Sequence, residues 1–183
     1  MTQALFDEYL AAVDAEADRA RALYDLLVLP GLELTYDDVD PARSAHAVAV
    51  GSRSFVGLES GLDAALATAR SGGAALIAAH PYDPAAAGGA PRTTARFALE
   101  WRELAGAVDR FELFNRRDCF HWVAAAGLPV VASGDFHRRE HLETWKTLLP
   151  AAKDEASVVG YLRSHRPAYL VDLRAASRLP AAA

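Results

Sequence analysis

The first two dozen residues carry apolar side chains at helical spacing. Positions three or four residues apart lie on the same face of a helix, and Asp and Arg side chains fill the opposite face. The pattern predicts one amphipathic helix over residues 4–24. Its expected apolar face consists of Phe6, Tyr9, Leu10, Val13, Ala17, Ala20 and Tyr24.

Beyond this helix, short apolar runs alternate with helix-like segments. The runs are apolar throughout, which is typical of strands buried on both faces. The alternation predicts an α/β fold with a mostly parallel sheet covered by helices. We find no internal repeat or linker, so residues 1–183 are expected to form one domain, ordered to about residue 173, with a tail over 174–183. The Gly-, Ala- and Pro-rich residues 82–92 resemble a mobile lid. The expected strands are 25–34, 45–51, 74–81, 108–115, 129–137 and 167–173, and the expected helices are 58–70, a segment capped by Thr93 or Thr94, 117–127 and 154–165.

The composition narrows the classes of function. An apolar fraction of 52% is typical of a folded domain, and a net charge of −5 argues against nucleic-acid binding, which leaves a small molecule as the expected partner. The single cysteine, Cys119, excludes an internal disulfide and a Cys-rich zinc site. The sequence lacks a secretory signal pattern and the run of about 18 apolar residues that a membrane helix needs. These features predict a cytoplasmic protein with no membrane segment.

Polar side chains recur at the ends of the expected strands, where active sites of parallel α/β folds assemble. These side chains are Glu33, His46, His80, Asp135 and His137. Each has an ordinary explanation alone, as a solvated edge group or a hydrogen-bonded histidine. Asp135 and His137 are two residues apart, so on an extended segment both side chains point the same way. Carboxylate and imidazole are ligands for divalent metal ions, and the five together therefore predict one metal site.

The motifs around these residues resemble those of the PHP (polymerase and histidinol phosphatase) family of metal-dependent phosphoesterases. The resemblance covers residues 27–149 and comprises PGLELT, His46 thirteen positions after Glu33, AAHP, FELFN and SGDFH. It implies a distorted, seven-stranded TIM-like barrel and two or three divalent ions of Mn, Zn or Fe. It further implies that a metal-bound hydroxide hydrolyses a small-molecule phosphate ester. The implied roles are Glu33 as a bridging ligand, His46 and His80 as ligands, Asp135 and His137 as ligands and catalytic groups, and Asn115 as an outer-shell or substrate contact.

The sequence also departs from the family pattern. The family opens with an H-x-H pair, an acidic ligand and a strand ending in T-D-H, and none of these is present. We therefore expect an N-terminally incomplete barrel with an exposed sheet edge beside residues 30–35, and with it a homo-oligomer or low solubility. The 183-residue chain is expected to bind one ion weakly and to hydrolyse phosphate esters slowly, and a longer form with the missing ligands to act faster. Arg138 is the expected phosphate contact, with Arg116 and Arg117 as further candidates.

Two other interpretations remain open. One is a catalytically inactive PHP-derived domain that binds a metal ion or phosphate, or that serves as an interaction module. The other is a metallohydrolase of the amidohydrolase type. That class needs a metal-bridging lysine at a strand end, and the two lysines of the chain, Lys146 and Lys153, are late in the sequence.

Overall fold

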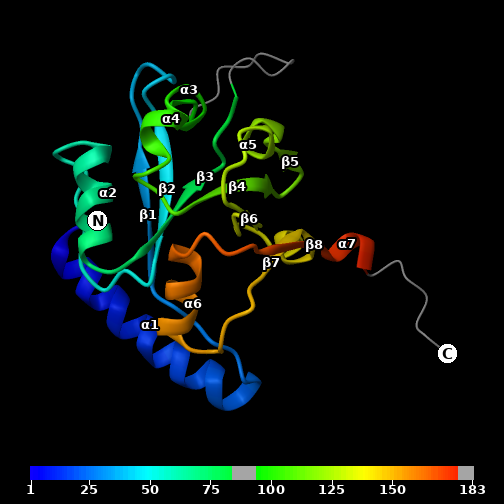
Figure 1. Cartoon of the computed structure of the whole chain (residues 1–183). Helices are drawn as coiled ribbons and strands as arrows, with labels where there is room; N and C mark the ends of the chain where they lie inside the picture. Colours follow the sequence, from blue (N-terminus) through cyan, green and yellow to red (C-terminus); the bar gives the residue numbers. More distant parts are fainter. Residues whose placement is uncertain (84–93, 177–183) are drawn as a thin grey trace.

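The computed structural model describes residues 1–83 and 94–176 of the chain (Figure 1). A central sheet has the strand order β1-β2-β3-β4, and both β5 and β6 pair with β4. A separate two-stranded antiparallel sheet contains β7 and β8. The strands are β1 (Gly31–Tyr36), β2 (Ala45–Val50), β3 (Ala75–Ala79), β4 (Arg110–Asn115), β5 (Asp118–Cys119), β6 (Val130–Ser133), β7 (Trp145–Leu148) and β8 (Tyr169–Asp172).

Helices occupy most of the segments predicted to be helical. The N-terminal and C-terminal long helices match the prediction closely, and the helix expected over 117–127 is shorter, because β5 occupies its beginning. The helices are α1 (Gln3–Tyr24), α2 (Leu62–Ser71), α3 (Arg96–Leu99), α4 (Trp101–Leu104), α5 (His121–Ala125), η1 (Arg139–Glu143, a 3-10 helix), α6 (Glu155–Arg163) and α7 (Leu173–Ala176). None of the helices in the described segments is long and apolar enough to cross a membrane.

The mixed direction of the strands corrects the prediction of a mostly parallel sheet. β2 is antiparallel to both β1 and β3, whereas β4 is parallel to β3 and to β6. The connections β1–β2 and β2–β3 run without the crossover that parallel neighbours require. Within the described residues the sheet does not close into a barrel, so the α/β class is confirmed and the TIM-like closure is not.

The two faces of the central sheet pack against different helices (Figure 1). Ala45, Ala47 and Ala49 of β2 are fully buried on the face covered by α2, and their small side chains let the helix approach closely. The opposite face packs Ile77 and neighbouring residues against Val159 and others of α6. This second face also carries the polar residues described below, at the end of the sheet away from α6.

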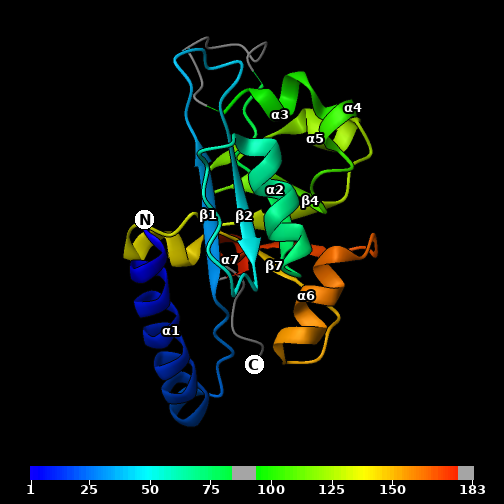
Figure 2. The same ribbon diagram turned by 90° about the vertical axis from the view of Figure 1, so that its left-hand side faces the viewer.

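The long helix α1 runs beside the β1 end of the sheet (Figure 2). Phe6 of α1 is completely buried, and the Tyr9 hydroxyl donates to the Gly31 carbonyl at 2.8 Å and accepts from the Gly31 N–H at 3.1 Å. Among residues 1–83 and 94–176, β1 pairs with β2 alone and is an edge strand, as predicted. Formation of a homo-oligomer through that edge stays a prediction.

Several predicted boundaries are wrong. The strand expected over 129–137 ends at Ser133. Residues 174–176, expected in a tail, belong to α7, and the rest of the tail and most of the lid-like segment lie outside the described residues. Thr94 does not cap a helix: its hydroxyl donates to the His80 carbonyl at 2.6 Å. Thr93, the other expected cap, lies outside the described residues.

Candidate metal site

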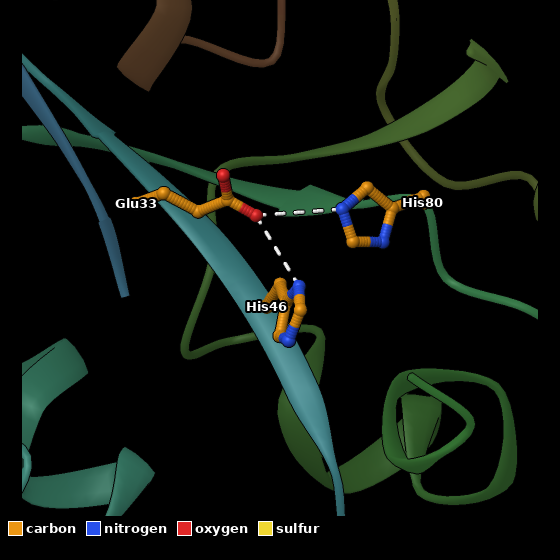
Figure 3. Close-up of side chains that lie close together, drawn as sticks. All are labelled: Glu33, His46 and His80. Atoms are coloured by element: carbon orange, nitrogen blue, oxygen red, sulfur yellow. Dashed lines mark ion pairs between the residues drawn. The ribbon is translucent and has the colours of Figure 1, made fainter. Parts of the chain in front are cut away.

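Three of the predicted ligands meet at one end of the sheet (Figure 3). The Oε1 atom of Glu33 on β1 lies 3.2 Å from Nδ1 of His46 on β2 and 3.4 Å from Nε2 of His80, which follows β3. One ligand atom from each residue lies within 4.8 Å of the others. Among the described residues, this is the group of His, Cys, Asp and Glu side chains that could hold a metal ion.

The antiparallel direction of β2 brings His46 into this group. His46 stands at the beginning of its strand, directly opposite Thr35 and Ala79. In a parallel arrangement the beginning of β2 would lie at the edge opposite the carboxyl ends of β1 and β3. Glu33 and Thr35 share a face of β1, so Glu33 is a diagonal cross-strand neighbour of His46 on the same face.

An uncommon backbone conformation directs His80. Its φ of 31° lies in the left-handed region, which a non-glycine residue rarely adopts. Thr94 holds the carbonyl of this residue, and the Thr94 hydroxyl also lies 3.5 Å from Nδ1 of the ring. These contacts leave Nε2 facing Glu33. Strained residues of this kind cluster at functional sites.

Interactions within the three-residue group shift the pKa values of Glu33 and His46. Hydrogen bonds with His46 and His80 hold the pKa of the Glu33 carboxyl far below its usual range, although partial burial opposes this. Burial disfavours the charged form of His46, but hydrogen bonds to Glu33 and Asp37 outweigh it and raise the pKa of His46. Asp37 reaches Nε2 of His46 at 3.0 Å. The site therefore has a stable negative charge on Glu33 and a carboxylate behind one of its histidines, an arrangement typical of metal-binding histidines.

Asp135 and His137 contact each other, and within the described residues they are not part of the three-residue group around Glu33. Their side chains lie 3.2 Å apart, and Arg116 binds the Asp135 carboxylate at 2.7 Å. The φ of Asp135 is 39°, so the pair meets through a turn after β6 and not along an extended strand. Gly134 permits this turn, because a Cβ atom there would lie 2.8 Å from the His141 carbonyl oxygen. A role of Asp135 and His137 as metal ligands stays a prediction.

The two expected substrate contacts differ in exposure. Arg138 is exposed and forms no side-chain hydrogen bond or ion pair with the described residues, so its role stays a prediction. Asn115 is buried, at 3% exposed, and its amide donates to Glu112 at 2.7 Å. This position suits the outer-shell role, and direct substrate contact by Asn115 stays a prediction.

The sequence interpretation missed Glu112 and His141. Glu112 belongs to the FELFN motif and is buried, and burial raises the pKa of its carboxyl against the opposing effect of its hydrogen bonds. A charged residue inside an apolar strand was the available signal. His141 accepts a hydrogen bond from the His137 N–H at 3.0 Å through Nδ1. It lies in the 3-10 helix η1, outside the expected strands, and the sequence gave no signal for it.

The chemistry of the three-residue group fits a divalent metal ion. One carboxylate and two imidazoles, on three neighbouring segments, offer the mixed oxygen and nitrogen donors that suit Zn, Mn or Fe. The ligand atoms already approach one another closely, and Asp37 and Thr94 contact the remaining ring nitrogens. The group supplies ligands for one ion, and further ions would need further ligands.

Comparison with known proteins supports the fold. No protein-family model and no curated protein matches the chain. Among solved structures, the fold is similar to that of a two-domain protein from Bacteroides vulgatus ATCC 8482, described as containing a predicted PHP-like metal-dependent phosphoesterase. The TM-score is 0.61 at 18% sequence identity, over 87% of this chain and 48% of that one. The chain thus spans about half the length of that protein, and at this identity the likeness concerns the fold alone.

Proposed function

We propose that this protein is a metal-dependent phosphoesterase that hydrolyses a small-molecule phosphate ester. The observation that carries the proposal is the convergence of Glu33, His46 and His80 at one end of the sheet. The similarity of the fold to that of a protein containing a predicted PHP-like phosphoesterase supports the same reaction class. The motifs PGLELT, AAHP and SGDFH agree with it.

Each residue of the three-residue group has a defined part in this proposal. Glu33, His46 and His80 would hold a divalent ion, which when bound lowers the pKa of water and offsets the charge of phosphoryl oxygens. Asp37 orients the imidazole of His46 through its 3.0 Å contact with Nε2. Thr94 orients the segment that carries His80.

Arg116 and His137, which both contact Asp135, supply positive charge and a proton to the phosphate ester. Arg116 donates to the Asp135 carbonyl through Nε and Nη2, and within residues 1–83 and 94–176 its Nη1 has no hydrogen-bond partner. That free donor is available to a phosphoryl oxygen. The His137 side chain is 65% exposed, and its Nδ1 faces Asp135. Its Nε2, which no described residue contacts, can protonate a leaving oxygen. Arg138 is a further candidate for phosphate contact.

Metal affinity and phosphate release test the proposal together. Wild-type protein should bind Mn²⁺ or Zn²⁺ in calorimetric titration and release phosphate from an aryl phosphate. Glu33→Gln should weaken metal binding by more than the roughly 10- to 100-fold typical of outer-shell substitutions. Asp135→Ala should abolish turnover and leave the fold intact. Glu16→Gln, a change at an exposed carboxylate of α1 that pairs with Arg19, is the control and should change neither quantity.

The outcomes separate the competing interpretations. Equal metal affinity in wild type and Glu33→Gln would refute the site. Metal binding without phosphate release from any ester would instead support the inactive metal- or phosphate-binding domain. That alternative draws on the separation of Asp135 and His137 from the three-residue group.

A further inference from the structure

A buried carboxylate lies at the end of the sheet that carries the three-residue group and the Asp135–His137 pair. Glu112 on β4 is only 2% exposed. Its Oε2 accepts hydrogen bonds from the His80 backbone N–H and from the Asn115 amide, each at 2.7 Å. Its Oε1 accepts from the Ser133 hydroxyl at 2.5 Å. Both carboxylate oxygens are therefore engaged, and the proposed reaction uses none of these contacts.

The three donors come from the ends of three different strands. His80 follows β3, Asn115 ends β4, and Ser133 ends β6 immediately before Gly134 and Asp135. The hydrogen bond to the His80 N–H fixes the residue whose left-handed backbone directs its ring toward Glu33. The Ser133 contact fixes the last strand position before the turn that carries Asp135. Glu112 thus contacts the chain at His80 of the three-residue group and at Ser133, two residues before Asp135.

An irregularity in β4 creates this arrangement. The register between β4 and β6 shifts between Glu112 and Phe114, as a β-bulge does. Residues three apart on a regular strand face opposite sides, because side chains alternate. The bulge turns Glu112 and Asn115 to the same side, where they bond to each other. Bulges that redirect side chains in this way are frequent beside active sites.

We propose that Glu112 is a positioning residue that sets the geometry of the candidate metal site through the His80 backbone and the β6 end. This inference rests on the proposed function and extends it to a residue that makes no contact with metal or substrate. Its carboxylate holds the ends of β3, β4 and β6 at fixed separations. Metal affinity therefore depends on Glu112 even though its oxygens bond to His80, Asn115 and Ser133.

The chain offers a matched control for a purely structural role. Asp109, just before β4, is also buried, at 6% exposed, and accepts a hydrogen bond from the Leu76 N–H of β3 at 2.7 Å. It thus makes the same kind of contact between the same two strands, at the end away from the site. Loss of either carboxylate should lower stability, but only loss of Glu112 should disturb the site.

The experiment compares Glu112→Ala, Glu112→Gln and Asp109→Ala. Zn²⁺ dissociation constants are measured by calorimetry, and ring-nitrogen chemical shifts of the histidines are measured in metal-free protein. Glu112→Ala should raise the dissociation constant about 10- to 100-fold and shift the His80 signals. Glu112→Gln should restore most of the affinity, because its oxygen can accept from His80 and Asn115 while its amide turns to Ser133. Asp109→Ala should leave the affinity and the His80 signals as in wild type.

Several results would overturn the inference. Unchanged Zn²⁺ affinity and His80 signals in folded Glu112→Ala would do so, as would an equal loss of affinity in Asp109→Ala. If Glu112→Ala does not fold, Ser133→Ala and Asn115→Ala each remove one contact and should each give a smaller loss of affinity. Absence of Zn²⁺ binding in wild type would refute the proposed function instead. The His80 signals of the metal-free variants would then still decide whether Glu112 positions that residue.

Discussion

At the scale of single residues, His46 is held between two carboxylates. Glu33 contacts Nδ1 at 3.2 Å and Asp37 contacts Nε2 at 3.0 Å, so the ring cannot turn without losing both contacts. The histidine side chain is 14% exposed, and burial alone would lower its pKa. The two carboxylates reverse that effect and favour the charged ring in metal-free protein.

This arrangement predicts a pH-dependent stabilisation that Asp37→Asn should reduce. The pKa of His46 in the folded protein is raised above its usual value of about 6.5 in the unfolded chain. A raised folded pKa adds stability that is fully present below the unfolded pKa and is lost as pH rises through the folded one. The free energy of unfolding of metal-free wild type should therefore exceed that of Asp37→Asn more at about pH 5 than at about pH 8.

Urea unfolding at the two pH values measures this difference, and NMR titration of His46 should show a lower pKa in Asp37→Asn. Asp38→Asn is the control, because Asp38 pairs with Arg43 and not with His46. A difference between wild type and Asp37→Asn that is the same at both pH values would contradict the assignment.

At the scale of elements, β4 joins the candidate site at one end to helix α6 at the other. Arg110, at the beginning of β4, is 1% exposed, and burial lowers the pKa of its guanidinium. The last carbonyl groups of a helix have no N–H partner within the helix. Arg110 donates hydrogen bonds to such carbonyl groups at the C-terminus of α6. Its side chain donates to the carbonyl oxygens of Leu162, Tyr161, Ser164 and Arg166, and to that of Val130 on β6.

Replacement of this arginine should be costly for stability and harmless for metal binding. Arg110→Met leaves several buried carbonyls without donors and should lower the free energy of unfolding by about 3 kcal/mol. Arg163→Met removes an exposed arginine of the same helix, bonded to the Gly73 carbonyl at 3.3 Å, and should cost less than about 1 kcal/mol. Chemical denaturation measures both losses. Equal losses would show that Arg110 does not anchor α6.

At the scale of the whole molecule, the candidate site ties an edge strand to the interior of the sheet. β1 pairs with β2 alone, whereas β3 is bordered by β2 and β4. Glu33, His46 and His80 come from these three neighbouring segments. An ion held by all three would restrain β1, which pairs with one strand among the described residues and should open locally more easily than β3.

Zn²⁺ should therefore protect β1 more than the separate β7–β8 sheet. At about 100 times the dissociation constant, bound metal adds about 2.7 kcal/mol to the free energy of unfolding. Amide hydrogen exchange should slow most in residues of β1 that exchange through local opening. Glu33→Gln should remove the effect, and protection confined to β7 and β8 would place the ion elsewhere.

Local patterns in the sequence determined much of the secondary structure. The helical spacing of Phe6, Tyr9 and Leu10 predicted α1, and the apolar runs located the strands of the central sheet except β5, which was predicted as helix. Such patterns are decisive because they depend on neighbours within a few residues. The unusual placement of Glu33, His46 and His80 at strand ends also identified three side chains that the structure brings together.

Only the tertiary structure decided how these parts are arranged. Strand direction depends on pairing between distant segments, so the sequence did not indicate that β2 is antiparallel, although that direction is what brings His46 to Glu33. The positive φ of Asp135 and the bulge after Glu112 are likewise features of the folded chain, in which β6 pairs with β4. These long-range contacts separate Asp135 from the three-residue group and bury Glu112 beneath it, because a residue's position in space is fixed by the strands it pairs with.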